Sequence, residues 1–415
     1  MPFFIYNLIG LQVALLIAVV AAWYSMDMRS ILKWKQRKAQ LTLEGRWYEL
    51  EKHFENVAKT WRPFVWFHYR YRFPGNFTVQ YALFLHSQGR LEEALAKVNL
   101  AIQQANGPQP IFWFRRPSDN LTTRCGALRT RVLVLTGLGR YSEARESADQ
   151  LKKLTGKPEA TLALLEYYCG RLDEALVEAE TVPREDGQYD TARGVVALAY
   201  TTRGEFHRAI EALSEEPGDI TKFYTEAGLK TMRASPDGIK LLELRQKKLD
   251  GVVQPARFLR LAEAYLGMDD FKNADLVLDQ AEMSLGANLA IQGSYCRFRA
   301  CSLAGQGKGS EVESYIERLG TIAKQRFARS FVYDTHFATG RAYFYLGRFT
   351  DALTKLSAAE QSALHPIEKH ATAYWIARTY EAAGERDKTI PYYRAVASES
   401  IPSWMRKKAA EALAQ

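Results

Sequence analysis

The chain has 415 residues, of which 47% are hydrophobic and 25% charged, and its formal net charge is +9. That length is too great for one ordinary hydrophobic core, which excludes a single compact domain. The excess positive charge lies at the N-terminal end, where residues 1–73 contain eleven Lys or Arg against five Asp or Glu. Nucleic-acid-binding proteins spread basic residues along their binding surface, so this distribution argues against a nucleic-acid partner.

The first predicted element is an apolar segment over residues 3–24, which contains no charged side chain. About 20 apolar residues span a bilayer, and aromatic residues at both ends of the segment suit the two membrane interfaces. The sequence therefore predicts one transmembrane helix in a bacterial inner membrane, with the N-terminus outside and the rest of the chain in the cytoplasm. Five basic residues that follow the segment are expected to face the anionic membrane surface: Arg29, Lys33, Lys35, Arg37 and Lys38.

Residues 25–75 form a basic, aromatic segment next to the predicted membrane helix, and residues 110–116 repeat its character. Aromatic rings and arginines suit the lipid headgroup layer or a binding hot spot for a membrane protein. Two other interpretations stay open, a cap on the first repeats and, least favoured, stacking on nucleic-acid bases. The residues expected to contact the membrane or a membrane protein are Trp61, Trp66, Phe67, Arg70, Arg72, Phe112, Trp113, Arg115 and Arg116.

Further along, one short phrase recurs: glycine, any residue, a large apolar residue, any two residues, alanine. Glycine permits the left-handed backbone that ends a helix, and alanine lets two helices cross closely. A sixth copy over 269–274 lacks only the glycine. The five full copies begin at Gly89, Gly139, Gly170, Gly204 and Gly347. Seven positions before the glycine position, a second small residue recurs at Ala82, Ala163, Ala197, Ala262 and Gly340, whereas Val132 departs.

This pattern resembles the tetratricopeptide repeat (TPR), whose unit of about 34 residues carries the same small residues and turn. The resemblance implies an all-α superhelical solenoid of antiparallel helix pairs, each packed on its neighbours. We expect about eight to nine units over 76–400, with an insertion near 104–122, and a capping helix over 401–415. A unit without the phrase is expected near 219–250, and Gly45 marks a degenerate first unit. The layout also resembles membrane-anchored TPR proteins of lipopolysaccharide assembly, but it lacks their rubredoxin-like module.

In the TPR family the first helix of each unit lines a binding groove. Arginines among aromatic rings in such a groove suit an extended peptide that carries acidic side chains or a free carboxylate. Glu263 and Glu381 fall on the same face, so the groove is not uniformly basic. The groove positions carried over from the family are Arg129, Tyr167, Tyr168, Arg297, Arg341, Phe344, Tyr345, Tyr374 and Arg378.

Signals for catalysis are poor. His365 and His370 are five residues apart, whereas a zinc-binding helix needs them four apart. The glycine-rich stretch 305–310 lacks the spacing of a phosphate-binding loop. The four cysteines form no C-x-x-C pair and are expected to be small buried residues. We predict no catalytic site, metal, cofactor or small-molecule substrate.

The sequence as a whole predicts a membrane-anchored scaffold or adaptor, which binds a protein through the groove and positions it at a membrane-protein partner. Two alternatives stay open. One is a TPR protein that faces the periplasm and assists secretion or envelope assembly. The other is an accessory subunit of a membrane enzyme complex.

Overall fold

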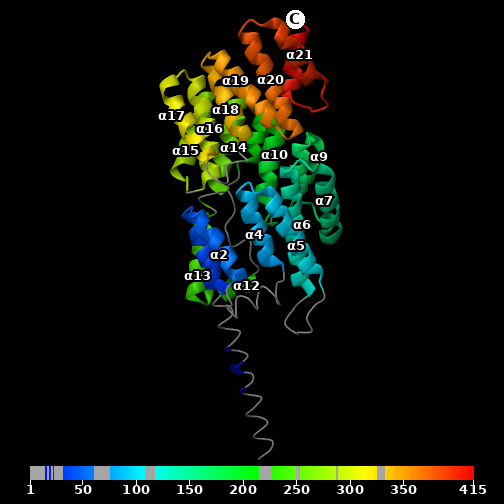
Figure 1. Cartoon of the computed structure of the whole chain (residues 1–415), viewed down its shortest axis with the longest axis vertical. Helices are drawn as coiled ribbons and strands as arrows, with labels where there is room; N and C mark the ends of the chain where they lie inside the picture. Colours follow the sequence, from blue (N-terminus) through cyan, green and yellow to red (C-terminus); the bar gives the residue numbers. More distant parts are fainter. Residues whose placement is uncertain are drawn as a thin grey trace, which may run out of the picture.

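The computed structural model describes residues 31–59, 75–107, 117–184, 186–214, 226–248, 250, 253–286, 288–324 and 332–415, with Leu15, Ala18, Val19 and Ala22. These residues form helices and turns without a strand, which confirms the all-α prediction. The helices are stacked side by side in a curved array (Figure 1).

After a helix over residues 31–43, the described helices follow in chain order. Their bounds are α2 (Trp47–Lys59), α4 (Asn76–Ser87), α5 (Leu91–Asn106), α6 (Pro117–Gly137), α7 (Tyr141–Thr155), α8 (Ala160–Tyr168), α9 (Leu172–Glu180), α10 (Tyr189–Arg203), α11 (Phe206–Ala212), α12 (Glu226–Arg233), α13 (Pro236–Lys248), α14 (Gln254–Gly267), α15 (Phe271–Met283), α16 (Leu289–Gly305), α17 (Gly309–Ala323), α18 (Val332–Tyr345), α19 (Phe349–Ser362), α20 (Pro366–Ala382), α21 (Arg386–Ser398) and α22 (Trp404–Leu413).

Each copy of the phrase forms the turn inside one helix pair. The five glycines have φ between +67° and +83°, which is the left-handed region. The residue after the glycine donates its backbone N–H to a carbonyl five residues earlier, as from Arg140 to Leu135 at 2.9 Å. Asp269 stands where the sixth copy lacks glycine, yet it adopts the same conformation with φ +55°. The turn geometry is therefore kept even where its preferred residue is missing.

The small residues of the pattern lie where the two helices of a pair cross. A Cβ added to Gly340 would meet Leu356 Cγ at 2.7 Å, so the crossing leaves no room for a larger side chain. The phrase alanines and the small residues that precede the turns are at most 1% exposed: Ala82, Ala94, Ala144, Ala163, Ala175, Ala197, Ala209, Ala262, Ala274, Ala300, Ala352 and Ala377.

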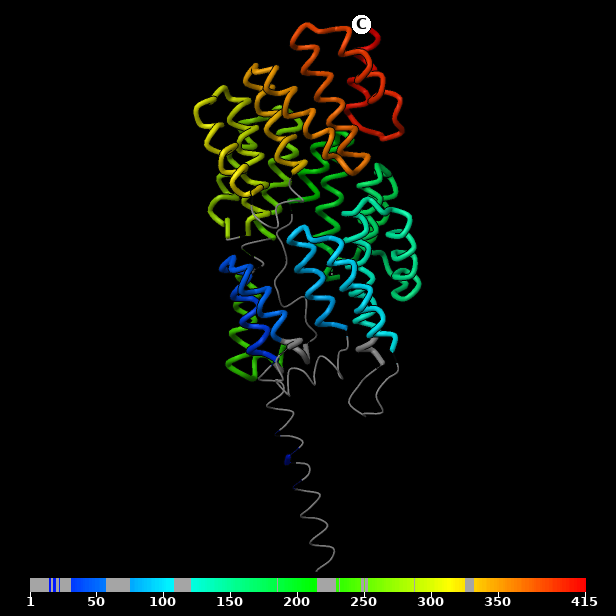
Figure 2. The backbone as a smooth tube through the Cα atoms, viewed as in Figure 1, coloured from blue at the N-terminus to red at the C-terminus, as the bar shows by residue number. Residues whose placement is uncertain are grey.

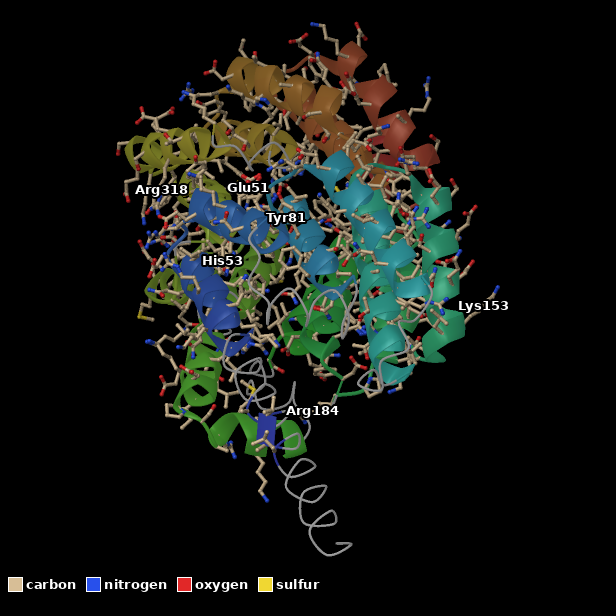
Figure 3. All side chains as sticks on the ribbon, turned by 60° about the horizontal axis from the view of Figure 1, so that its bottom comes forward. Glu51, His53, Tyr81, Lys153, Arg184 and Arg318 are labelled. Atoms are coloured by element: carbon tan, nitrogen blue, oxygen red, sulfur yellow. The ribbon has the colours of Figure 1, made fainter. Side chains whose placement is uncertain are left out.

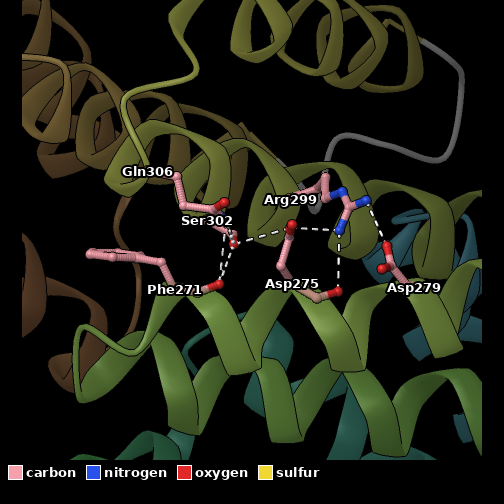
Figure 4. Close-up of polar contacts among 6 residues, drawn as sticks. All are labelled: Phe271, Asp275, Asp279, Arg299, Ser302 and Gln306. Atoms are coloured by element: carbon pink, nitrogen blue, oxygen red, sulfur yellow. Dashed lines mark hydrogen bonds and ion pairs between the residues drawn. The ribbon is translucent and has the colours of Figure 1, made fainter.

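Polar contacts add to the alanine packing between neighbouring pairs. Arg299 on α16 binds two carboxylates on α15, Asp275 at 2.6 Å and Asp279 at 2.7 Å (Figure 4). Ser302, one turn further along α16, donates to the backbone carbonyl of Phe271 at 3.0 Å. Because these bonds tie the start of one pair to the end of the previous one, they fix the step between units.

The hairpin of α12 and α13 lies in the region where the sequence places a unit without the phrase, but it does not stack within the array. Instead, α14 packs directly on α10 and α11. Ala264 of α14 shares a core with Val195 and Ala209, and Arg257 Nε donates to the carbonyl of Leu213 at 2.6 Å. Figures 1 and 2 show α12 and α13 beside α2 instead. The chain thus leaves the stack after α11 and rejoins it at α14.

The N-terminal helices complete the array next to α4. Gly45, which the sequence assigns to a degenerate first unit, has a left-handed backbone with φ +65°. Phe54 of α2 stacks on Tyr81 of α4 at 5.2 Å between ring centroids. Glu51 of α2 forms an ion pair with Arg90, and Figure 3 labels Glu51 and Tyr81 at this contact.

The structure contradicts the predicted membrane location. Among the described residues, no helix is long and apolar enough to cross a bilayer. Most of the segment 3–24 lies outside the described residues. Helix α7, for example, buries one face against its neighbours and carries charged side chains on the other. The prediction of a single-pass inner-membrane protein is therefore wrong on this finding.

The C-terminal helices return to the middle of the chain. Tyr141 OH lies 2.6 Å from Nδ1 of His365, which is 224 residues away in sequence. Ile401 and Trp404 lie against the turns at Gly170 and Gly204. Helix α20 contacts α8, and α22 contacts α10; Figure 1 shows α20 at the same end of the array as α9 and α10. We call this contact the junction; its residues are Tyr141, Tyr168, Gly170, Leu172 and Gly204 on one side and His365, Ile367, Ile401 and Trp404 on the other.

Candidate binding site

The superhelix encloses a cavity of about 1050 Å³. Its walls come mainly from the first helix of each pair, among them α4, α8, α10, α14, α16, α18 and α20. This is the face that the TPR resemblance implies for a groove. Pockets of roughly 300–1,000 Å³ hold drug-sized ligands, so the cavity has room for a short stretch of peptide.

Three arginines and three acidic residues line the central part of the cavity. Arg260 pairs with Glu263 at 2.7 Å, and Arg297 pairs with Asp334. Arg341 lies on the same wall, and no ion pair joins it to any acidic residue in the described part of the chain. Its Nε is buried without a hydrogen-bond partner. Of these three arginines, Arg341 is therefore the one without an ion-pair partner among the described residues, although the charge of Glu263 acts on it from a greater distance.

Aromatic rings hold the Arg341 side chain in place. Its guanidinium lies 4.5 Å from the ring centroid of Trp375 and 5.9 Å from that of Phe337. Such cation–π contacts fix the orientation of the group without using its hydrogen-bond donors. A guanidinium carries a planar set of N–H donors, which suits a planar anion such as a carboxylate.

The third acidic residue, Glu368, sits at the start of α20. Burial raises the pKa of Glu368 to about 7, although its carboxylate accepts backbone N–H groups from Leu364 at 3.0 Å and His365 at 3.1 Å. Burial lowers the pKa of His365 to about 4, so this imidazole is neutral at pH 7. Burial also raises the pKa of Tyr333, whose hydroxyl donates to the carbonyl of Glu368 at 3.1 Å.

Four of the nine predicted groove residues line the cavity: Tyr167, Tyr168, Arg297 and Arg341. Of the other five, Arg129 forms a two-bond ion pair with the buried Glu159, with both distances 2.8 Å. The other four surround Trp375 or its neighbours: Phe344, Tyr345, Tyr374 and Arg378. Tyr374 is only 3% exposed, so its ring packs in the core.

The basic residues after position 28 face protein as well as solvent. Lys38 donates to Gln80 Oε1 at 2.6 Å and lines the cavity, and Arg37 pairs with Glu49 at 3.4 Å. Lys33 is exposed and Lys35 half-buried. The remaining residues predicted for membrane or membrane-protein contact lie outside the described residues: Arg29, Trp61, Trp66, Phe67, Arg70, Arg72, Phe112, Trp113, Arg115 and Arg116.

The two histidines of α20 have separate structural surroundings. His365 precedes the helix and contacts Tyr168, with 4.3 Å between ring centroids. His370 is fully buried, with Glu399 Oε2 at 2.5 Å from Nδ1 and Ser403 Oγ at 2.6 Å from Nε2. No group of three metal-ligating side chains occurs within the part of the chain that is described. The stretch 305–310 covers the last residue of α16, the turn and the first two residues of α17.

No family model matches the chain, and no curated protein matches it. Among solved structures it is similar to a Rap protein complexed with competence and sporulation factor, at 11% identity and TM-score 0.49, over 92% of this chain and 99% of that one. It is also similar to a monomeric IFIT1 mutant with Gppp-AAAA (14%, TM-score 0.39, 91% and 80%) and to Naa15/Naa10 bound to HypK (14%, 0.26, 92% and 65%). These values are too low to support an argument, so the assignment of TPR-type repeats rests on the turns and crossings described above.

Sequence reasoning missed several residues of the cavity. Arg260 and Asp334 do not occupy family groove positions, and Trp375 was hidden among other aromatic residues of α20. His365 and Trp404 reach the cavity only because the C-terminal helices return to α8 and α10. A contact between residues so distant in sequence leaves no local pattern from which it can be inferred.

Proposed function

We propose that this protein is an interaction scaffold that binds an extended segment of a partner protein in the cavity of its superhelix. It acts by binding and not by catalysis, without a metal or cofactor. The observation that carries the proposal is Arg341, a cation with no ion-pair partner among the described residues, held on Trp375 at 4.5 Å inside a cavity that is wide enough for peptide.

The chemistry of the cavity favours an acidic segment. Arg260 and Arg297 already have carboxylate partners within the protein, whereas Arg341 does not. A carboxylate from the ligand would neutralise Arg341 and form charge-assisted hydrogen bonds. The half-buried rings of Tyr167 and Tyr168 offer apolar surface to the rest of the segment. Either an acidic side chain or a C-terminal carboxylate meets this requirement.

A displayed peptide library, panned against the purified protein, tests the proposal. The selected peptides should be rich in Asp and Glu. Hydrogen bonds to charged groups contribute about 1.5–3 kcal/mol, so Arg341→Gln should weaken the binding of a selected peptide by roughly 10- to 100-fold. Amidating the peptide C-terminus distinguishes a C-terminal carboxylate from an acidic side chain.

Arg378→Gln is the matched control, because Arg378 also lies over the Trp375 ring, at 5.1 Å, but does not line the cavity. It should change the affinity less than about fivefold, since only a cation–π contact of about 0.5–1 kcal/mol is lost. Equal losses in the two variants, or selected peptides without acidic groups, would contradict the proposal.

A further inference from the structure

The junction differs in kind from the contacts that build the array. Successive pairs interlock through buried alanines and ion pairs such as Arg145–Glu166 at 2.5 Å. Across the junction, the described residues form one hydrogen bond, Tyr141 to His365, and no ion pair. The rest is apolar contact, in which Leu172, Ile367 and Ile401 are buried together.

Each side of the junction is held together independently of the other. On the C-terminal side, His370 of α20 binds both Glu399 and Ser403, and Ser403 caps α22 by accepting from the N–H of Arg406 at 3.0 Å. These bonds make α20, the loop after α21 and α22 one body. On the other side, Gly170 and Gly204 belong to turns that are complete within their own pairs. Separation of the two sides would break no bond inside either body.

The junction also forms part of the cavity wall. Tyr168, His365, Ile367 and Trp404 belong to the junction and line the cavity. A movement that parts the junction therefore opens the cavity sideways, which is the direct way for a chain segment to enter without threading an end.

We propose that the junction is a clasp, which opens and closes while both sides stay folded, and that its opening admits the partner segment to the cavity. The second half of this statement rests on the proposed function, whereas the opening itself does not. Local openings that cost less than global unfolding are general in proteins and occur where few buried contacts join two bodies.

The clasp can be locked by one disulfide. A Cβ built on Gly170 lies 3.9 Å from Cβ of Ile401, which is within the range of about 3.5–4.5 Å for disulfides. The Ile401→Cys change also removes the side-chain atoms that would crowd residue 170. The variant is Gly170→Cys with Ile401→Cys in a Cys169→Ala background, because Cys169 is a free neighbouring thiol. Each single cysteine variant serves as its control.

The two histidines of α20 report opening and unfolding separately. Both are buried, but His365 lies in the junction and His370 lies inside the C-terminal body. Diethylpyrocarbonate modification, followed by mass spectrometry, should slow at least tenfold at His365 in the oxidised lock and stay unchanged at His370. Ile401→Ala, which weakens the junction without a lock, should accelerate modification of His365 at least threefold and leave His370 unchanged.

Changes that are equal at the two histidines, or a lock without effect on His365, would overturn the clasp. The association rate of a library-selected peptide tests the entry route: it should fall at least tenfold in the oxidised lock and recover on reduction. An unchanged rate would overturn the gating role while leaving the binding proposal intact. Failure to select any peptide would overturn the binding proposal, and the histidine data would still decide whether the clasp opens.

Discussion

The same left-handed glycine turn has two different surroundings in this molecule. A Cβ added to Gly139 or Gly347 would meet no atom within 4 Å. At Gly170 and Gly204 it would lie 2.8 Å from Ile401 Cγ1 and 2.7 Å from Trp404 Cβ. In the first two turns glycine serves only the local backbone. In the other two it also leaves bare backbone against which the C-terminal helices pack.

The largest predicted effect comes from adding a methyl group at the junction turns. At Gly139 or Gly347, alanine should lower the free energy of unfolding by about 1–2 kcal/mol, because a left-handed backbone is strained for any residue with a Cβ. At Gly170 or Gly204, alanine should cost about 1–3 kcal/mol more, because the methyl group overlaps the opposing side chain. Urea denaturation of the four variants measures the difference.

The excess at Gly170 and Gly204 has an upper limit. Opening the junction would relieve the overlap, so the excess cannot exceed the free energy of that opening. Where the limit is reached, modification of His365 by diethylpyrocarbonate should accelerate in the variant. If the free energy of unfolding falls equally in all four variants and modification of His365 is not faster, the two classes of turn do not differ.

The next effect concerns how the stability of the fold depends on pH through two residues at the start of α20, Glu368 and His365. Lowering the pH from 7 to 5 stabilises the fold through Glu368, whose folded pKa of about 7 lies above the unfolded value. The same change destabilises it through His365, whose folded pKa of about 4 lies below the unfolded value. Each contribution is about 2 kcal/mol over this interval, so the two nearly cancel.

Glu368→Gln removes the contribution of Glu368 and leaves that of His365. Between pH 7 and pH 5 the variant should lose about 2 kcal/mol more stability than the parent protein, since only the His365 contribution remains. Thermal or urea unfolding at the two pH values gives the comparison. Parallel pH curves for the two proteins would show that burial does not raise the pKa of the Glu368 carboxyl group.

The smallest effect tests the turn conformation without the junction. Asp269→Gly should raise the free energy of unfolding by about 0.5–1 kcal/mol, because glycine adopts φ +55° without strain. The substitution also removes a negative charge from the C-terminal end of α14, where it is unfavourable. The hydrogen bond from Tyr345 OH at 2.9 Å is lost and limits the gain. Making the same substitution in a Tyr345→Phe background, where this hydrogen bond is already absent, measures the backbone effect alone.

The local half of this structure could be predicted from the sequence. The phrase specifies a left-handed turn and a close crossing, both of which depend on residues within one unit. That is why the turns at Gly89 or Gly347 and the buried alanines follow directly from the pattern. The fixed spacing of groove positions from the small residues also led to Tyr167, Tyr168, Arg297 and Arg341, which line the cavity, but the other five predicted groove residues do not line it.

The contacts between residues far apart in the sequence could not be predicted. Spacing alone suggested that α12 and α13 stack between α11 and α14, but whether a hairpin stacks depends on surfaces that belong to other units. The ion pair that neutralises Arg297 is another case, because Asp334 comes from the next pair of helices. The apolar segment 3–24 led to an error of another kind. Its composition is a local pattern, but we used it to predict a membrane location for the whole protein.

The excursion of α12 and α13 has a geometric consequence for the whole superhelix. Each unit in a stack adds a fixed rotation and rise, so leaving one unit out changes the angular position of every later unit by one step. The direct contact of α14 with α10 and α11 therefore sets where α20 and α22 arrive. Had the hairpin been inserted into the stack, Trp404 would face a different turn from that of Gly204. The C-terminal helices would then not meet the middle of the superhelix at the junction.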